Sequence, residues 1–302
     1  MNVVEVERLS KSYGSLKAVD GLSFVADKGE ILALVGPDGA GKTSTFRAIC
    51  GLITYDSGSI HIGGHDVANK FGKIKPIMGY MPQSFSLYQD LSVEENLLFY
   101  AGLFGLSRKA IEEKKNVLYE FSGLGQFRSR RAGALSGGMK QKLALSCALV
   151  HDPQVLLLDE PTTGVDPLSR RQFWDILKSL RAGSSSIVIS TPYMDEVGLA
   201  DRAIFVYQGR KLAEGAPGEL IGMFRGNVYR ANLNPTPEMK TKLDSIGGLH
   251  WRRFGSSIHI YTSPDMTIDH YLVTLRDAGI EQSAITRIEP CLEDAFIQLM
   301  GR

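Results

Sequence analysis

The chain has 302 residues, of which 43% are hydrophobic and 22% charged, a composition typical of globular proteins and long enough for about two domains. Its formal net charge of +1 provides no chain-wide basic surface for nucleic acid or an anionic membrane. No stretch of about 18 apolar residues occurs, and the N-terminus has no basic region followed by an apolar one. We therefore expect a chain that neither spans a membrane nor is exported and that has no nucleic-acid partner.

The cysteines indicate a reducing compartment. Cys50, Cys147 and Cys291 are odd in number, widely separated and without C-x-x-C spacing. We expect reduced thiols in a cytosolic protein, all three as small core residues.

The first predicted elements are short strands that lead into a glycine-rich loop. Apolar runs at residues 3–6, 22–25 and 31–35 indicate strands, because glycines separate them. Gly36 to Thr43 follows the third run and fits the phosphate-binding pattern G-x-x-x-x-G-K-[ST], ahead of a helix predicted from Thr43 to Ile49. A plain glycine-rich turn between strand and helix is the alternative.

The residue types of this loop suit a nucleotide triphosphate. Its glycines let successive N–H groups point into one concavity, which binds an anion. The ammonium of Lys42 would contact the outer phosphates, the hydroxyl of Thr43 would ligate Mg²⁺, and the N-terminus of the new helix would face the same group. The candidate nucleotide-binding residues here are Gly36, Pro37, Asp38, Gly39, Ala40, Gly41, Lys42, Thr43 and Ser44.

Residues 84 to 150 are predicted to be mostly helical. Ser92 to Glu95 reads S-x-x-E, a capping box ahead of an apolar stretch, and Ser107 can cap a second helix that runs to about Phe121. We infer a helical subdomain inserted between strands of a nucleotide-binding core.

Within this region, Leu135 to Gln141 reads Leu-Ser-Gly-Gly-Met-Lys-Gln. A serine and two glycines that open the predicted helix 138–149 form another anion-binding helix N-terminus. One nucleotide does not need two such sites in one chain. An ordinary capped helix is the alternative.

Two acids end the next strand. The apolar run 155–158 delivers Asp159 and Glu160 to the sheet edge where the phosphate loop also lies. Asp159 suits Mg²⁺ coordination and Glu160 suits polarising the attacking water, although strands often end in acids at a solvated edge.

Strands and helices then alternate, which indicates a parallel sheet covered on both faces. The predicted elements are strands 155–158, 187–189 and 203–206 and helices 167–181 and 193–200, followed by a Gly-rich passage at 209–226.

Residues 226–302 are predicted to form a separate small domain. Its order, strand-helix-strand-strand-helix-strand, is that of a ferredoxin-like α+β unit, with one helix added. The predicted strands are 228–233, 249–253, 258–261 and 284–288, and the predicted helices are 236–245, 267–278 and 292–300.

The segment Leu135 to Gln141 resembles the signature sequence of ABC transporter ATPases, and the resemblance extends over about residues 3 to 222. It implies a P-loop NTPase cassette with a helical subdomain over residues 1–222. Cassettes of that family dimerise head to tail. The signature residues, here Ser136, Gly137 and Gly138, then close over the γ-phosphate held by the partner's phosphate loop.

Further positions match the family and take their expected roles from it. Tyr13 would stack on adenine, and Gln83 would contact Mg²⁺, assist catalysis and sense the membrane partner. Asp166, in Gly-Val-Asp-Pro, would touch the partner's phosphate loop, and this form is more like the drug and polysaccharide exporter branch. The resemblance implies Glu160 and Gln83 as catalytic residues, and Thr43, Gln83 and Asp159 as metal ligands.

One position departs from the family. Pro192 stands where the family places a γ-phosphate-sensing histidine, and proline has no side-chain donor. By analogy with an oxyanion hole, losing one transition-state donor costs about 2.7–4 kcal/mol, or about 10²–10³ in rate.

The region between Gln83 and Phe104 is rich in large apolar side chains. Resemblance to the family implies that it forms the groove for a coupling helix of a transmembrane subunit, whereas packing inside the subdomain is the alternative for most of them. These residues are Phe85, Leu87, Tyr88, Leu97, Leu98, Phe99, Leu103 and Phe104.

The resemblance implies an ATP-binding subunit of an ABC exporter, similar to ATPases paired with ABC-2-type permeases and to the first half of tandem-cassette multidrug ATPases. Its partners would be a second cassette, identical or different, and an integral-membrane permease that holds it at the cytoplasmic face of the plasma membrane. The C-terminal domain would regulate or dimerise. The alternatives are a degenerate, slowly hydrolysing subunit that supports a more active cassette, and a soluble ABC protein without a transport role.

Overall fold

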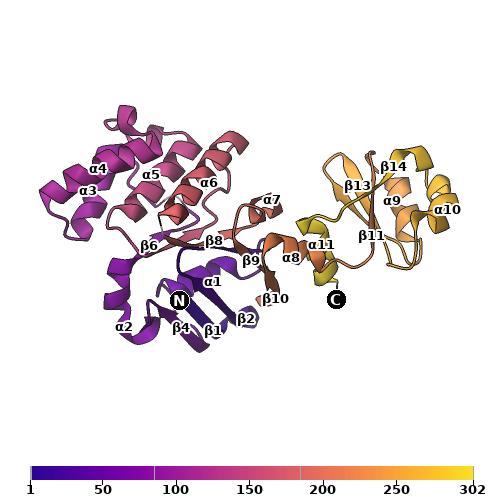
Figure 1. The fold of residues 1–302 in the computed structure, drawn as a ribbon, viewed down its shortest axis with the longest axis horizontal. Coiled ribbons are helices and arrows are strands. Elements are labelled where there is room, and N and C mark those ends of the chain that lie inside the picture. The colour runs from indigo at the N-terminus through magenta and orange to yellow at the C-terminus, as the bar shows by residue number, and fades with distance from the viewer. Residues whose placement is uncertain (1, 85, 184, 302) are drawn as a thin grey trace. The chain divides into compact units, whose positions relative to one another are not determined.

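The computed structural model describes residues 2–84, 86–183 and 185–301, and the chain divides into two compact units, Met1–Pro217 and Gly218–Arg302 (Figure 1). The division falls shortly before residue 222, where the sequence placed the end of the first domain. Each unit has its own hydrophobic cluster. No helix in these described ranges is long and apolar enough to cross a membrane.

The first unit is built on a six-stranded sheet in the order β10-β9-β3-β8-β7-β6. Its neighbours are parallel except for the antiparallel pair β9–β10. The strands are β3 (Ile31–Val35), β6 (Met78–Met81), β7 (Val155–Asp159), β8 (Ser186–Thr191), β9 (Arg202–Tyr207) and β10 (Arg210–Gly215). Every residue of β3, β7 and β8 is buried, which confirms a parallel sheet covered on both faces.

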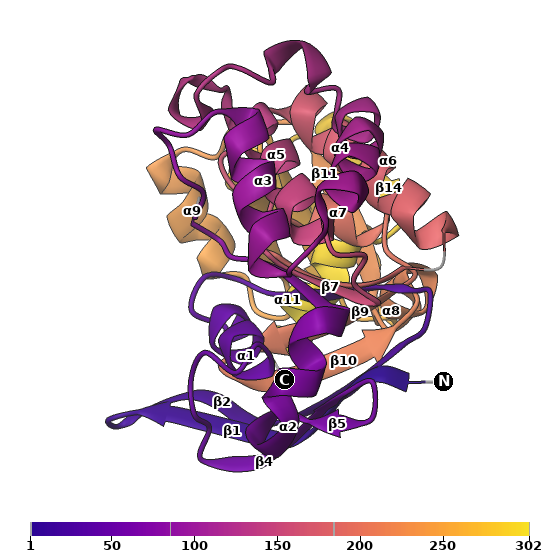
Figure 2. The same ribbon diagram turned by 90° about the vertical axis from the view of Figure 1, so that its left-hand side faces the viewer.

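A second, antiparallel sheet has the order β2-β1-β4-β5. Its strands are β1 (Asn2–Tyr13), β2 (Leu16–Asp27), β4 (Ser57–Ile62) and β5 (His65–Asp66), so the predicted strands 3–6 and 22–25 are parts of longer ones. Figures 1 and 2 both place helix α1 (Lys42–Ile49) between the two sheets. Phe46 of α1 is fully buried in the cluster that also holds Val4 and Leu34. This packing fixes the helix that follows the glycine-rich loop.

The remaining helices of this unit are α2 (Val67–Ile74), α3 (Val93–Leu103), α4 (Arg108–Ser122), α5 (Gly137–Leu149), α6 (Pro167–Ala182) and α7 (Met194–Val197). The capping box before α3 is confirmed, since Glu95 N donates to Ser92 Oγ over 3.1 Å and Ser92 N donates to the Glu95 carboxylate over 2.7 Å. Ser107 caps α4, as predicted, by accepting from Ala110 N. Helices α5 and α6 lie on the side of the six-stranded sheet away from α1 (Figure 1).

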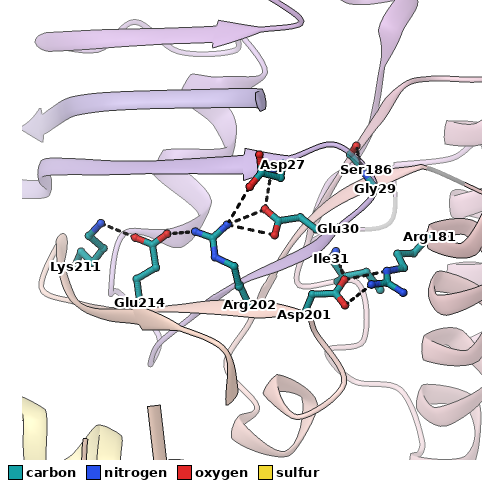
Figure 3. A network of polar contacts seen from close by, with 10 residues as sticks. All are labelled: Asp27, Gly29, Glu30, Ile31, Arg181, Ser186, Asp201, Arg202, Lys211 and Glu214. Atoms are coloured by element: carbon teal, nitrogen blue, oxygen red, sulfur yellow. Dashed lines mark hydrogen bonds and ion pairs between the residues drawn. The ribbon is translucent and has the colours of Figure 1, made fainter. Parts of the chain in front are cut away.

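Charged side chains hold together the sheet edge at which β3 and β9 begin (Figure 3). Arg202 Nη1 donates to both carboxylate oxygens of Glu30, over 3.0 and 3.2 Å, and lies 3.8 Å from Asp27. Its Nη2 pairs with Glu214, which also binds Lys211. This Arg202 cluster links β2, β3, β9 and β10 at the edge opposite to the carboxyl ends of the parallel strands.

The second unit is a four-stranded antiparallel sheet in the order β12-β13-β11-β14 with helices on both faces. Its elements are α8 (Pro217–Gly222), β11 (Asn227–Ala231), α9 (Pro237–Asp244), β12 (His250–Phe254), β13 (Ser257–Thr262), α10 (Leu272–Asp277), β14 (Ile285–Ile288) and α11 (Leu292–Met300). From β11 onward, the strands and longer helices follow the order that the sequence predicts.

The prediction for the cysteines is wrong at one position. Cys50 and Cys147 are buried thiols, but Cys291 is exposed. Cys291 is the N-cap of α11 with extended backbone, so it lies at a helix end instead of within the core. The Gly-rich passage 209–226 is also more regular than predicted, because it contains β10 and α8.

Candidate functional site

The glycine-rich loop leaves β3 and enters α1 through positions that only glycine can occupy. A Cβ on Gly36 would lie 2.1 Å from the carbonyl oxygen of Val206, and Gly41 has a φ of 100°. No side chain caps the N-terminus of α1, and no acid lies in its first turn. The first N–H groups of α1 are therefore free to donate to an anion, which the helix dipole also favours.

Lys42 folds back over this loop. Its Nζ donates to the carbonyl oxygens of Gly36, over 2.8 Å, and Pro37, over 3.0 Å, and lies 3.1 Å from Glu160 Oε1. Its side chain is only 3% exposed. A buried ammonium at the mouth of an N–H-lined loop supplies positive charge where an anion would bind.

Asp159 ends β7 beside the same loop. Its Oδ1 accepts from Ser190 Oγ over 2.7 Å and from Thr43 Oγ1 over 3.2 Å, while its Oδ2 is buried and has no hydrogen-bond partner among the residues placed in the structure. Burial raises the pKa of this carboxyl, and the hydrogen bonds from Ser190 and Thr43 oppose that shift. An unpaired carboxylate oxygen next to a threonine hydroxyl is the donor set that a hard divalent cation takes, with water or phosphate completing the shell.

Glu160 joins three loops. Its carboxylate pairs with Lys42 through Oε1, and its Oε2 accepts from Gln83 Nε2 over 2.8 Å and from Thr163 Oγ1 over 3.2 Å. Its backbone has a φ of 47°, which is unusual for a residue with a side chain, and its N–H donates to Ser190 Oγ. The structure thus brings together Lys42, Gln83 and Glu160 from three elements that are far apart in the sequence.

Other predicted residues lie elsewhere. Ser136 caps α5 by accepting from Met139 N, and Asp166 caps α6 by accepting from Ser169 N. Hydrogen bonds from the side chain and then the backbone of Ser169 lower the pKa of Asp166. Tyr13 is 45% exposed, with Lys11 Nζ 5.3 Å from its ring centre. No hydrogen bond or ion pair joins these three predicted residues to the phosphate loop in the described part of the chain.

The two glycines after Ser136 differ in their surroundings. Gly137 is exposed, whereas Gly138 is buried against α6, where a Cβ would lie 2.5 Å from Ser169 Oγ. Glycine at 138 thus permits close packing of α5 on α6, and the exposed N-terminus of α5 remains open to a ligand.

The hydroxyls that precede Pro192 are already engaged. Ser190 Oγ donates to Asp159, and Thr191 Oγ1 donates to Glu196 over 2.6 Å while accepting from Tyr193 N. The Tyr193 ring lies under the Arg170 guanidinium, 4.3 Å from ring centre to Cζ. Neither hydroxyl is positioned as a free donor in place of the histidine that position 192 lacks.

Sequence reasoning missed Ser190, which bonds to both neighbouring acids of the site. It is the register partner of Asp159 on β8. Because the carboxyl ends of parallel strands meet at one edge, the polar residue near the end of the buried run 187–189 was the available signal.

The large apolar side chains between Gln83 and Phe104 lie partly at the surface and partly in the interior. Leu87 and Leu97 are buried, whereas Tyr88, Leu98, Phe99 and Leu103 are 38–65% exposed. Phe85 lies outside the described residues. The ring of Phe104 stacks on His151 at 3.6 Å, next to a largely apolar cavity of about 220 Å³ that Tyr80, Pro82, Leu87, Tyr100 and Phe104 help to line. An apolar hollow therefore lies just beyond Gln83.

Comparisons with known proteins agree with this geometry. The family model described as ABC transporter matches residues 19–163. The probable multidrug ABC transporter ATP-binding protein YbhF of Escherichia coli is 43% identical over 218 residues, which are 72% of this chain and 38% of that protein. The chain thus spans well under half the length of that relative.

Other relatives match along almost their whole length. The Nod factor export ATP-binding protein I of Burkholderia orbicola is 37% identical over 99% of this chain and 97% of its own. Among solved structures, an ATP-binding subunit of an ABC transporter is 30% identical with a TM-score of 0.67, covering 74% of this chain and 93% of that one. The cbiO1 protein of Clostridium perfringens, part of the transporter complex cbiONQ, is 26% identical with the same TM-score and covers 73% and 91%.

Proposed function

The chain belongs to the ATP-binding subunits of ABC transporters, a family of ATPases, and we propose that it binds ATP with Mg²⁺ and powers export by a separate membrane subunit. The observation that carries the proposal is the convergence of Lys42, Thr43, Asp159, Glu160 and Gln83 at one sheet edge, with Asp159 Oδ2 buried and unpaired.

Each residue has a role that its contacts support. The loop N–H groups and Lys42 hold the phosphates, and ATP must compete with Glu160 for the Lys42 ammonium. Thr43, Asp159 and Gln83 would hold Mg²⁺, which would neutralise phosphate charge when bound. Glu160 orients and polarises the attacking water, and its ion pair with Lys42 places its carboxylate beside the phosphate loop.

The site is half of a composite one. The exposed N-terminus of α5 at Ser136 and Gly137 makes no bond to the chain's own phosphate loop, so it suits the nucleotide of a second cassette. We assign Asp166 to the same interface and Tyr13 to the adenine ring. The second cassette is either a copy of this chain or a different one.

The exposed side chains of Tyr88, Leu98, Phe99 and Leu103 and the nearby cavity form the groove for a helix of a membrane permease. Through it the chain would sit at the cytoplasmic face of the membrane. Export is favoured because relatives are named for multidrug transport and Nod factor export.

Affinity purification of the chain from detergent-solubilised membranes tests this assignment. We expect an integral-membrane protein to co-purify, and Leu103→Glu to abolish its recovery. Val117→Glu is the matched control, since both side chains are 65% exposed and Val117 lies on α4. Recovery of no membrane protein with the unaltered chain would favour a non-transport ABC protein.

A second candidate is a slow cassette that binds ATP and supports a more active partner. Pro192 favours it, because the neighbouring hydroxyls of Ser190 and Thr191 already have partners and do not replace the missing donor. Steady-state ATP hydrolysis by the purified chain, alone and with its partner cassette, separates the two.

A further inference from the structure

The second unit contains a cavity of about 370 Å³ between α11 and strands β12 and β13. This volume is within the usual range for small-molecule sites. The cavity is lined by Phe224, His250, Arg252, Tyr261, Asp294 and Ile297, together with Gln298 and Gly301. None of these residues belongs to the nucleotide site.

The cavity exists because α11 covers its sheet face incompletely. Trp251 of β12 packs with Ile258 and Ile260 in the core cluster under α9 and α10, and α11 lies on the opposite face (Figure 1). Side chains alternate along a strand, so His250 and Arg252 point to the α11 side. A nine-residue helix does not span four strands, and the part of the face over β12 is left open.

The buried carboxylate at the floor of the cavity has hydrogen-bond partners for both of its oxygens. Asp294 is fully buried, and its Oδ1 accepts from Tyr261 OH over 2.8 Å and bonds to His259 Nδ1 over 2.9 Å. Its Oδ2 accepts from Cys291 N over 2.7 Å. Phe254 stacks on His259 at 3.8 Å, and Tyr261, bonded to Asp294 through its hydroxyl, lines the cavity.

Positive charge at the mouth is not compensated. Arg252 is exposed, and its guanidinium has no hydrogen bond or ion pair with any residue that the structure describes. Arg230 is exposed and equally unpaired within those residues, and it lies in the same row, because Arg252, His259 and Arg230 are register partners across three strands. The Asp294 carboxylate is already bonded to Tyr261, His259 and Cys291, so the unpaired Arg252 guanidinium that lines the cavity favours an anionic partner.

We propose that this cavity binds a small organic anion with an apolar body. The anionic group, a carboxylate, sulfonate or phosphate, pairs with the Arg252 guanidinium. The apolar body rests on Phe224, Tyr261 and Ile297. The second unit is on this view a ligand-binding domain, and the site is independent of the proposed ATP site.

The test measures fluorescence of 8-anilinonaphthalene-1-sulfonate on the full chain, with excess MgADP added to occupy the nucleotide site. We expect one saturable site per chain. Arg252→Met weakens binding about tenfold, by loss of a charge-assisted bond. Arg253→Met is the matched control, since the adjacent Arg253 bonds to Gly255 O and Asn234 and points to the other face, and it leaves the affinity within about twofold.

The neutral analogue N-phenyl-1-naphthylamine, titrated against the unaltered chain, tests whether the negative charge of the ligand contributes to binding. We expect it to bind about tenfold more weakly than the sulfonate and to be insensitive to Arg252→Met. Equal affinity for the two probes, equal effects of the two arginine variants, or absence of saturable binding overturns the proposal. Because MgADP is present throughout, none of these results depends on the nucleotide site.

Discussion

The two edges of the six-stranded sheet use charged residues in opposite ways. At the edge where β3 and β9 begin, Arg202 is surrounded by the carboxylates of Glu30, Asp27 and Glu214 (Figure 3). At the opposite edge, Asp159 keeps one buried oxygen without a partner, and Glu160 is held in a strained backbone conformation.

This difference separates stability from function. Polar groups that satisfy one another stabilise a fold, whereas a buried group left unsatisfied costs free energy unless a ligand completes it. Substitutions at the carboxyl-end edge should therefore change activity, and substitutions in the Arg202 cluster should change stability.

The largest effect is expected from Glu160→Gln. Loss of the base should lower ATP hydrolysis by about 10²–10⁴, while ATP affinity should not fall, because the ion pair that holds Lys42 is removed. Glu214→Gln, at the opposite edge, is the control and should leave the rate nearly unchanged. A colorimetric phosphate assay and fluorescent-nucleotide titration measure the two quantities, and an unchanged rate in Glu160→Gln would refute its catalytic role.

Pro192→His should raise the hydrolysis rate by about tenfold or more, because it restores a donor toward the γ-phosphate. Pro192→Ala removes the ring without adding a donor and should give no gain. Steady-state kinetics at saturating MgATP compare the three proteins. If histidine and alanine have the same effect, the missing donor does not limit the reaction.

Arg202→Met should lower the free energy of unfolding by about 1–2 kcal/mol, a modest value because the side chain is 30% exposed and its ion pairs are partly screened by solvent. ATP affinity should be unchanged. Urea unfolding measures the first quantity. An altered ATP affinity with unaltered stability would contradict the division between the two edges.

The smallest effect concerns pH and Asp159. Burial raises its pKa above the ordinary 3.8, so the ionised carboxylate destabilises the folded chain above the raised pKa, and this penalty disappears as the pH falls toward 3.8. Asp159→Asn lacks the penalty, so its melting temperature should exceed that of the unaltered chain at neutral pH. The difference should shrink on acidification; a difference independent of pH would show that the carboxylate carries no such penalty.

The sequence predicted local features well and distant contacts poorly. The phosphate loop and the caps at Ser92 and Ser107 depend on residues within a few positions of one another, so pattern and spacing were sufficient. The bond from Ser190 to Asp159 depends on strand register, and the bond from His259 to Asp294 joins residues 35 positions apart. The position of Ser190 at the end of a buried run indicates only the sheet edge at which it lies, and the bond from His259 to Asp294 leaves no local pattern at all.

Short and half-exposed strands were missed because they too depend on pairing with distant parts of the chain. β10, with sequence Arg-Lys-Leu-Ala-Glu-Gly, has too few apolar residues to stand out beside glycines, and its pairing with β9 stabilises it. β6 has only four residues and is recognisable as a strand through its pairing with β7.

The most direct test of the account is the shift in melting temperature caused by MgATP in Lys42→Ala and in Lys211→Ala. A ligand at about 100 times its Kd stabilises the folded state by about 2.7 kcal/mol. MgATP should stabilise the unaltered chain and Lys211→Ala, whose lysine lies in the Arg202 cluster, but not Lys42→Ala. Equal stabilisation of all three would contradict the assignment of the nucleotide site.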